Sequence, residues 1–314
     1  MGGSGGGGPF RYQSPEALRN RVREAEEKAK DAAFEAALSG TLGELLRDYN
    51  ARDTDLVRER LDKLKEALEG TIEGSVDQIF GGSVAKHTYV DGLSDIDSLV
   101  IINATDLQDK SPQGALAHMK KSLEGGGLAD ATSVDHGRMA VTVEYRDGMT
   151  IQLLPALKDA DGRLHVPSSR RDGWSRINPA AFSEALTRHN QQCGNKLIPT
   201  IKLAKAINGT LPEAQKLSGY HMESLGIAAF RNYDGEKTTT AMLPVFFERG
   251  RELVLSPIRD TTGQSVHVDE YLGPANSPER IAISHVMGRI ARRMRNATAA
   301  GSTPQWRAMF GFEE

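Results

Sequence analysis

Cysteine is almost absent from the chain, which has Cys193 alone among its 314 residues. One thiol excludes an internal disulfide framework and a zinc site built from several cysteines. Its neighbours Gln191, Gln192 and Gly194 are polar, and we interpret the thiol as a bystander rather than a nucleophile. The eight histidines show no short, regular spacing of the kind that metal clusters use.

Long apolar runs and a large net charge are also missing. No run approaches the roughly 20 residues that a membrane-spanning helix needs, and the start lacks the basic and apolar regions of a signal peptide. We therefore expect a cytoplasmic protein that does not bind membranes. The net charge of −3, from 39 basic and 42 acidic residues, argues against strong binding of duplex nucleic acid, although it permits a local basic pocket.

The chain contains no Walker A sequence, Rossmann glycine fingerprint, nucleophile elbow or internal repeat. Its 39% apolar and 26% charged residues allow a sizeable core in one two-lobed enzyme. We expect a flexible start over residues 1–13, which include six glycines and a serine in a row of seven. Residues 14–175 would form a catalytic lobe with N-terminal helices. Residues 176–314 would form a helical lobe that completes a cleft.

Local patterns predict the elements of each lobe. Proline after a capping residue predicts helix starts, alternation predicts strands, and glycine pairs predict turns. The expected helices of the first lobe cover 15–40, 42–49 and 56–72. In the second lobe, one helix begins after Asn178, two cover Lys196–Ile207 and Gly219–Phe230, and a last one begins after Ser277. The expected strands cover 76–80 and 98–102, a hairpin of 138–145 with 149–154, and a weaker hairpin around 161–162 that ends at Pro167.

The segment 81–97, GGSVAKHTYVDGLSDID, carries the clearest chemistry. Asp95 and Asp97 lie two residues apart on an expected strand, so their side chains converge on one face while Ile96 points to the core. Two carboxylates held together repel each other unless a cation neutralises them. Hard oxygen ligands favour Mg²⁺ or Mn²⁺. We therefore predict a metal site at Asp95 and Asp97.

The glycine turn that begins this segment suits a triphosphate. Gly81 and Gly82 allow backbone N–H groups to approach phosphates without a Cβ clash. The Ser83 hydroxyl can donate to a phosphate oxygen, and Lys86 adds a positive charge nearby. Each part alone is common, but the strand–turn–strand order of both parts is far more restrictive.

Together these parts resemble the hG[GS]…[DE]h[DE] signature of the polymerase-β-like nucleotidyltransferase superfamily. More closely, the chain resembles the bacterial cGAS/DncV-like nucleotidyltransferases (CD-NTases) of anti-phage defence. The stretches LLRDYNARD, VAKHTYVDGLSDID, LLPA, IPTIKLAKAIN and LSGYHMESL carry this narrower resemblance, which spans about residues 42–230.

The resemblance implies an α+β fold: a nucleotidyltransferase lobe with a mixed β-sheet, a C-terminal helical lobe and a cleft between them. Asp95 and Asp97 would be catalytic metal ligands, and a hydroxyl would attack the α-phosphorus of a nucleoside triphosphate such as ATP with loss of pyrophosphate. Lys205 and Ser218 match positions that contact donor phosphates, and Tyr220 one that stacks on a base. The structural alternatives are a solvated lysine and a tyrosine that only packs.

One position departs from the family. The third carboxylate slot, in a [DE]-h-h-P pattern, reads Gln152-Leu153-Leu154-Pro155. A neutral amide holds Mg²⁺ more weakly than a carboxylate does. If Asp147-Gly148 is a two-residue turn, Val143 pairs with Gln152 and Glu144 points to the opposite face, so Glu144 would not substitute. A bulge in the hairpin would reverse the side of Glu144, but we expect the two-residue turn. Gln152 is then an engineered replacement of a glutamate, a natural feature of a lineage with altered metal use, or the mark of a degenerate nucleotide binder.

The leading functional hypothesis is a metal-dependent synthase that joins nucleoside triphosphates into a cyclic or short linear oligonucleotide second messenger. That product would activate a separate downstream effector during phage infection, a role that comes wholly from the resemblance. The alternatives are a template-independent polymerase or terminal transferase that extends a nucleic acid or protein hydroxyl, and a nucleotide-binding protein impaired by Gln152.

Overall fold

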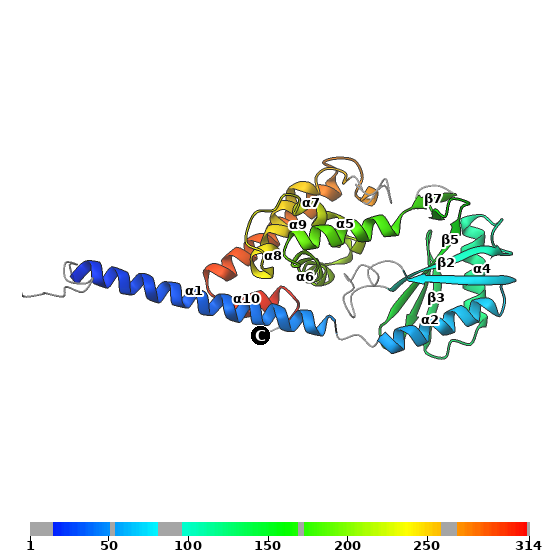
Figure 1. Ribbon diagram of the computed structural model, residues 1–314, viewed down its shortest axis with the longest axis horizontal. Coiled ribbons are helices and arrows are strands. Elements are labelled where there is room, and N and C mark those ends of the chain that lie inside the picture. The colour runs from blue at the N-terminus through cyan, green and yellow to red at the C-terminus, as the bar shows by residue number, and fades with distance from the viewer. Residues whose placement is uncertain (1–14, 51–53, 81–95, 169–172, 259–268, 313–314) are drawn as a thin grey trace, which may run out of the picture.

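The computed structural model describes residues 15–50, 54–80, 96–168, 173–258 and 269–312. They form a sheet lobe and a helical lobe, and the strand before α5 leads from the first into the second (Figure 1). The expected α+β class is confirmed, because strands dominate one lobe and helices the other. The cleft expected between the lobes stays a prediction.

The sheet is mixed and has seven strands in the order β1-β2-β5-β4-β3, with β6 on β5 and β7 on β6. β2 and β5 run parallel, whereas the other pairs are antiparallel. Both predicted hairpins are present, as β4–β5 and β5–β6. The strands are β1 (Gly74–Phe80), β2 (Ile96–Thr105), β3 (Ala131–His136), β4 (Val141–Tyr145), β5 (Thr150–Lys158), β6 (Leu164–Pro167) and β7 (Trp174–Ile177).

Two helices, α2 (Thr54–Glu69) and α4 (Pro112–Gly125), pack on one face of this sheet. Leu64 of α2 and Met119 of α4 are fully buried in one core with Val143 and Ile151. Burial alternates along β4 and β5, so every second residue of these strands lies on the other, more open face. That open face carries the sheet's contribution to the candidate site.

The helical lobe gathers six helices around its own core: α5 (Pro179–Gln192), α6 (Leu197–Gly209), α7 (Gly219–Ala229), α8 (Thr239–Leu253), α9 (Pro278–Ala299) and α10 (Thr303–Ala308). Asn178 caps α5 and Ser277 caps α9, as the asparagine–proline and serine–proline pairs predict. Gly226 lets α7 approach α6 closely, because a Cβ there would lie 2.7 Å from the Ile201 side chain.

The first helix, α1 (Pro15–Asp48), differs from the prediction. It runs for 34 residues through Gly40, where we expected an end, and it includes the segment expected to be a separate helix. Glycine inside a helix costs about 1 kcal/mol relative to alanine, and burial of Leu38, Leu42 and Leu45 exceeds that cost. These leucines belong to the core of the helical lobe, so α1 packs there and not with the sheet lobe, where the sequence analysis placed it.

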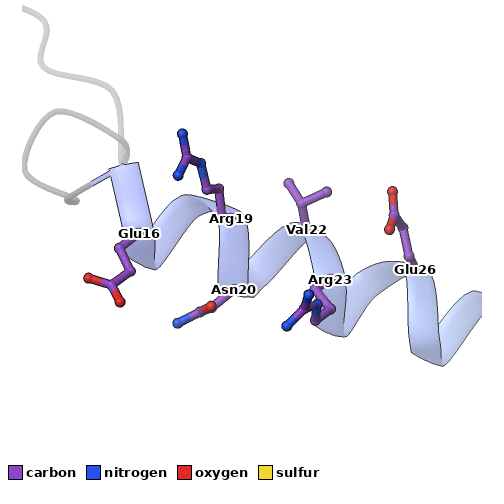
Figure 2. Close-up of a pocket in the computed structure, with 6 residues that line it drawn as sticks. All are labelled: Glu16, Arg19, Asn20, Val22, Arg23 and Glu26. Carbon is purple, nitrogen blue, oxygen red and sulfur yellow. The ribbon is translucent and has the colours of Figure 1, made fainter.

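The first turns of α1 project away from both lobes (Figure 1). A shallow hollow beside them is lined by side chains of α1 alone, among them Arg19, Val22 and Glu26 (Figure 2). Because these residues come from a single helix, the hollow provides no converging walls for a ligand. Across the described ranges, no helix is long and apolar enough to cross a membrane.

Candidate functional site

Strands β2, β5 and β4 bring three positions into one row. Asp97, the second residue of β2, is the Cα partner of Gln152 on β5. Gln152 is in turn the partner of Thr142 on β4. Paired residues of neighbouring strands share a face of the sheet, so positions 97, 152 and 142 form a row across three strands. The slot identified from the [DE]-h-h-P pattern thus stands beside the second aspartate of the predicted pair.

The other predicted residues of the catalytic segment lie outside the described residues. These are Asp95, Gly82, Ser83 and Lys86, and their roles stay predictions. Among the described residues, which do not include Asp95, no three His, Cys, Asp or Glu side chains converge as a metal site would require. The row itself offers a carboxylate position beside an amide, and both supply the hard oxygen donors that suit Mg²⁺.

The turn between β4 and β5 corrects the expected register. It has three residues rather than two: the Tyr145 carbonyl accepts from the Gly148 amide at 2.9 Å, and the Tyr145 amide donates to the Met149 carbonyl at 2.9 Å. Gly148 has a φ of +85°, the left-handed conformation that such a turn needs at its last position. Val143 therefore pairs with Ile151, and not with Gln152 as we expected.

This register also reverses the predicted side of Glu144. Glu144 pairs with Thr150, two residues from the Thr142–Gln152 pair, so it lies on the same open face as Gln152. Its carboxylate accepts a hydrogen bond from the Ser133 hydroxyl on β3 at 3.0 Å. Glu144 is therefore an additional carboxylate on the open face that carries Gln152, although its hydrogen bond is directed toward β3 and away from β5.

A buried arginine fixes this hairpin to α2. The Arg60 guanidinium lies 2.9 Å from the Asp147 carboxylate and 4.0 Å above the centre of the Tyr145 ring. The Tyr145 hydroxyl is buried and has no hydrogen-bond partner among the described residues. Burial raises the pKa of Tyr145 to about 12, against the opposing effect of the Arg60 charge. These contacts anchor the turn whose length sets the register of Gln152.

In the helical lobe, Lys205 of α6 is buried in an ion pair. Its Nζ lies 2.7 Å from Oε1 of Glu223 on α7, and the two side chains are 5% and 1% exposed. Gly219, the first residue of α7, lies directly over this ammonium group, because a Cβ there would lie 3.4 Å from Nζ. Sequence reasoning identified Lys205 but missed Glu223, whose place in the helical stretch LSGYHMESL gives no sign of burial.

The start of α7 is an exposed helix N-terminus with its cap formed. Ser218 is the capping residue, and its hydroxyl oxygen accepts from the His221 amide at 3.2 Å. The Gly219 amide has no acceptor among the described residues and is exposed. The positive end of the helix dipole and the amide both favour an anion at this point.

Tyr220 is half-buried at the same helix start. Its ring packs on Phe182 of α5, with 4.8 Å between ring centres. This contact is the packing role that the sequence analysis held as the alternative to base stacking. The stacking role stays a prediction, because one face of an aromatic ring can pack while the other remains available to a ligand.

Residues 37–190 match the family model of the Second Messenger Oligonucleotide or Dinucleotide Synthetase domain. The likeness to the CD-NTases that the sequence motifs indicate is confirmed. No curated protein matches it in sequence.

Solved CD-NTase structures share this fold. Escherichia coli MS115-1 CdnC with ATP is 17% identical, with 90% of this chain and 97% of that chain covered and a TM-score of 0.56. Vibrio cholerae DncV cyclic AMP-GMP synthase with the linear intermediate pppA(3',5')pG is 10% identical, with 95% and 90% covered and a TM-score of 0.58. Bradyrhizobium diazoefficiens CdnG with GTP is 15% identical, with 87% and 91% covered and a TM-score of 0.56.

The matched segment covers part of the candidate site. It includes the predicted metal ligands Asp95 and Asp97 and the departing position Gln152. Lys205 and the start of α7 lie beyond it, so their assignment depends on the resemblance stated above and on the geometry of α6 and α7. The solved structures named above are all less than 25% identical to this chain, so their likeness supports the fold alone.

Proposed function

We propose that this protein is a CD-NTase that joins nucleoside triphosphates into a cyclic or short linear oligonucleotide, using Mg²⁺ or Mn²⁺ held by Asp95 and Asp97. The observation that carries the proposal is the row of positions 97, 152 and 142 inside a segment that matches a second-messenger synthetase domain. The related CdnC and CdnG structures hold ATP and GTP, which supports triphosphates as substrates.

Residues of both lobes would hold the phosphates of the nucleotide. The Ser83 hydroxyl and the Gly82 amide would hold the phosphates from the sheet side, with Lys86 adding charge. The Gly219 amide, the Ser218 hydroxyl and the α7 dipole would hold them from the helical side. When bound, the divalent ion neutralises phosphate charge and lowers the pKa of the attacking hydroxyl. The hydroxyl would give up its proton to solvent, and its oxygen would bond to the α-phosphorus as the bond to pyrophosphate breaks.

Lys205 contributes less charge to this site than a lone lysine would. Glu223 neutralises most of its field at 2.7 Å, and the ammonium is almost fully buried. We propose that Lys205 acts on the phosphates mainly by supporting the first turn of α7 from below. Tyr220, held against Phe182, would then present its other face to the base.

The biological role follows from the family. We propose that the product is a second messenger of anti-phage defence that acts on a separate effector. One solved structure shows Escherichia coli CdnC in complex with a HORMA protein, so a regulatory partner is a further proposal for this chain.

A product assay on two matched variants tests the chemistry. Gln152→Glu restores a carboxylate next to position 97, whereas Thr142→Glu adds the same charge one strand farther away. Each protein is incubated with the four labelled NTPs, the four dNTPs and Mg²⁺ or Mn²⁺, and then treated with phosphatase before mass spectrometry. We expect Gln152→Glu to raise turnover by orders of magnitude and Thr142→Glu to raise it far less, because its charge lies one strand farther from position 97.

The products separate the candidate functions. A phosphatase-resistant cyclic oligonucleotide supports the messenger synthase, and a ladder of long linear products supports a terminal transferase. Absence of product from every form, with triphosphate still bound, supports a nucleotide-binding protein without chemistry. No gain from Gln152→Glu would contradict the view that this amide limits catalysis.

A further inference from the structure

We infer that Tyr271, with His221, Asp269 and Arg280 behind it, positions the first turn of α7 for the phosphates of the donor nucleotide. We name these four residues the α7 brace. The inference rests on the proposed function, because it assigns a role toward a triphosphate at the start of α7. None of the four lies within the segment that matches the synthetase domain.

The Tyr271 hydroxyl makes two contacts with the start of α7. It accepts a hydrogen bond from the Ser218 amide at 3.1 Å and lies 2.8 Å from Nδ1 of His221. One oxygen atom therefore holds both the capping residue and the third residue of the helix. With the Ser218 and His221 amides both engaged, the Gly219 amide remains as the exposed donor over Lys205. The brace thus determines where that donor points.

His221 is fully buried and transmits this constraint inward. The Tyr271 hydroxyl can donate to Nδ1 while accepting from Ser218, which places the histidine proton on Nε2. Nε2 lies 3.9 Å from the Asp269 carboxylate, which is too far for a hydrogen bond, but the negative charge of the carboxylate attracts the dipole of the Nε2–H group. Burial lowers the pKa of His221 to about 4, so the ring is neutral near pH 7 and its Nδ1 can accept a hydrogen bond from the Tyr271 hydroxyl.

Arg280 fixes the segment that carries Tyr271. Its fully buried guanidinium donates to the Asp269 carboxylate at 2.8 Å and to the Asp269 carbonyl at 3.1 Å. It also donates to the Gly273 carbonyl at 3.0 Å and to the Val254 carbonyl at 2.9 Å. A single α9 side chain thereby ties the turn containing Tyr271 to the end of α8. The segment cannot shift without leaving a buried charge unpaired.

The arrangement is more specific than packing alone requires. Tyr271 is 52% exposed, so its ring contributes little to the core, yet its hydroxyl is directed at the start of α7 beside Lys205. Functional groups that must be held within a fraction of an ångström are commonly fixed by hydrogen bonds from such supporting residues. The brace therefore acts through the α7 amides and would not itself touch the nucleotide.

The test compares Tyr271→Phe with Tyr233→Phe. Tyr233 lies just beyond the other end of α7, and its hydroxyl donates to the Glu236 carbonyl at 2.9 Å, so this variant removes one comparable hydrogen bond from the same lobe. Calorimetry measures the binding of ATP, GTP, CTP and UTP in the presence of Mg²⁺, and of the nucleoside that matches the tightest of them. Thermal unfolding of each protein is recorded in parallel.

We expect Tyr271→Phe to weaken triphosphate binding about tenfold, the loss typical of one hydrogen bond. Nucleoside binding should stay unchanged, because the brace acts on the phosphate side. Tyr233→Phe should bind like the wild type. In an active form, Tyr271→Phe should raise KM more than it lowers kcat.

Two failures are distinguishable. If the wild type binds triphosphate and Tyr271→Phe binds it equally well, the brace has no positioning role and the proposed function stands. If both ligands lose affinity equally, the brace is only structural and the inference is wrong. A wild type that binds none of the four triphosphates overturns the proposed function itself, and the brace with it.

Discussion

The Lys205–Glu223 pair gives the sharpest prediction about stability. Both side chains are almost fully buried, and their atoms are 2.7 Å apart. Removing one partner of such a pair leaves a buried charge and costs about 3–5 kcal/mol. For Glu223→Gln we expect about 3 kcal/mol, because the amide oxygen can still accept a hydrogen bond from Nζ. For Lys205→Met we expect about 4 kcal/mol, because no donor replaces the ammonium.

A double variant separates the pair from its surroundings. Lys205→Met combined with Glu223→Leu removes both charges and fills the space with apolar groups, a change that is often neutral for buried pairs. We expect the double variant to be destabilised by at most about 2 kcal/mol. Glu223→Leu alone should cost at least the roughly 3 kcal/mol of Glu223→Gln, because leucine supplies no acceptor for Nζ. The coupling in the cycle of Lys205→Met and Glu223→Leu is then at least about 5 kcal/mol, well beyond the error of additivity for independent sites.

Urea unfolding followed by tryptophan emission measures these values. The chain has two tryptophans: Trp306, fully buried in the helical lobe, and Trp174, on β7 of the sheet lobe. A Trp174→Phe background leaves Trp306 to report on the lobe that contains the ion pair. Single variants within about 0.5 kcal/mol of their parent, or a double variant less stable than either single one, would refute the reasoning.

Three further predictions concern the fold. Tyr145→Phe should leave stability unchanged or raise it by about 1 kcal/mol, because it removes a buried hydroxyl without a partner among the described residues, and urea unfolding will show a loss if that hydroxyl is in fact satisfied. Gly226→Ala should destabilise the protein by about 1–3 kcal/mol, because its Cβ would lie 2.7 Å from the Ile201 side chain. Gly40→Ala should stabilise it, because nothing lies within 4 Å of the added Cβ and alanine favours the helix. Equal effects of the two variants in thermal melts would contradict the close packing of α6 and α7. His221 has a pKa of about 4 in the folded state against 6.5 in the unfolded state, so the unfolded state binds the extra proton between these values. The free energy of unfolding should therefore fall by about 3 kcal/mol as the pH drops from 6.5 to 4. Unfolding measured across that pH range should show a smaller dependence for His221→Gln.

The strands and most helix starts were predictable because their causes are local. Alternation along β4 and β5 places Val143 and Ile151 in the core, and the proline pairs after Asn178 and Ser277 start α5 and α9. The error about the β4–β5 turn was also avoidable. A Val143–Gln152 pair would place a valine on the face that carries the polar residues, so the hydrophobic pattern itself favours the observed register.

The helical side of the site was not predictable in the same way. Tyr271 lies 53 residues from Ser218 and 50 from His221 along the chain, and no local pattern indicates such pairings. The residues around Glu223 in α7 are both polar and apolar, so their pattern does not indicate that its side chain is buried. Only the packing of α6 against α7 shows that it is buried beside Lys205. Long-range polar pairs of this kind depend on tertiary packing rather than on periodicity.

The length of the turn that ends at Gly148 determines which residues of β4 lie on the same face as Gln152. Since β5 is held in register by β2, a change of one residue in the loop would move β4 instead. Val141 and Val143 would then stand in the place of Thr142 and Glu144, and apolar groups would border position 152. Natural or designed variation can therefore lengthen this loop only in steps of two residues if the polarity beside the catalytic row is to be kept.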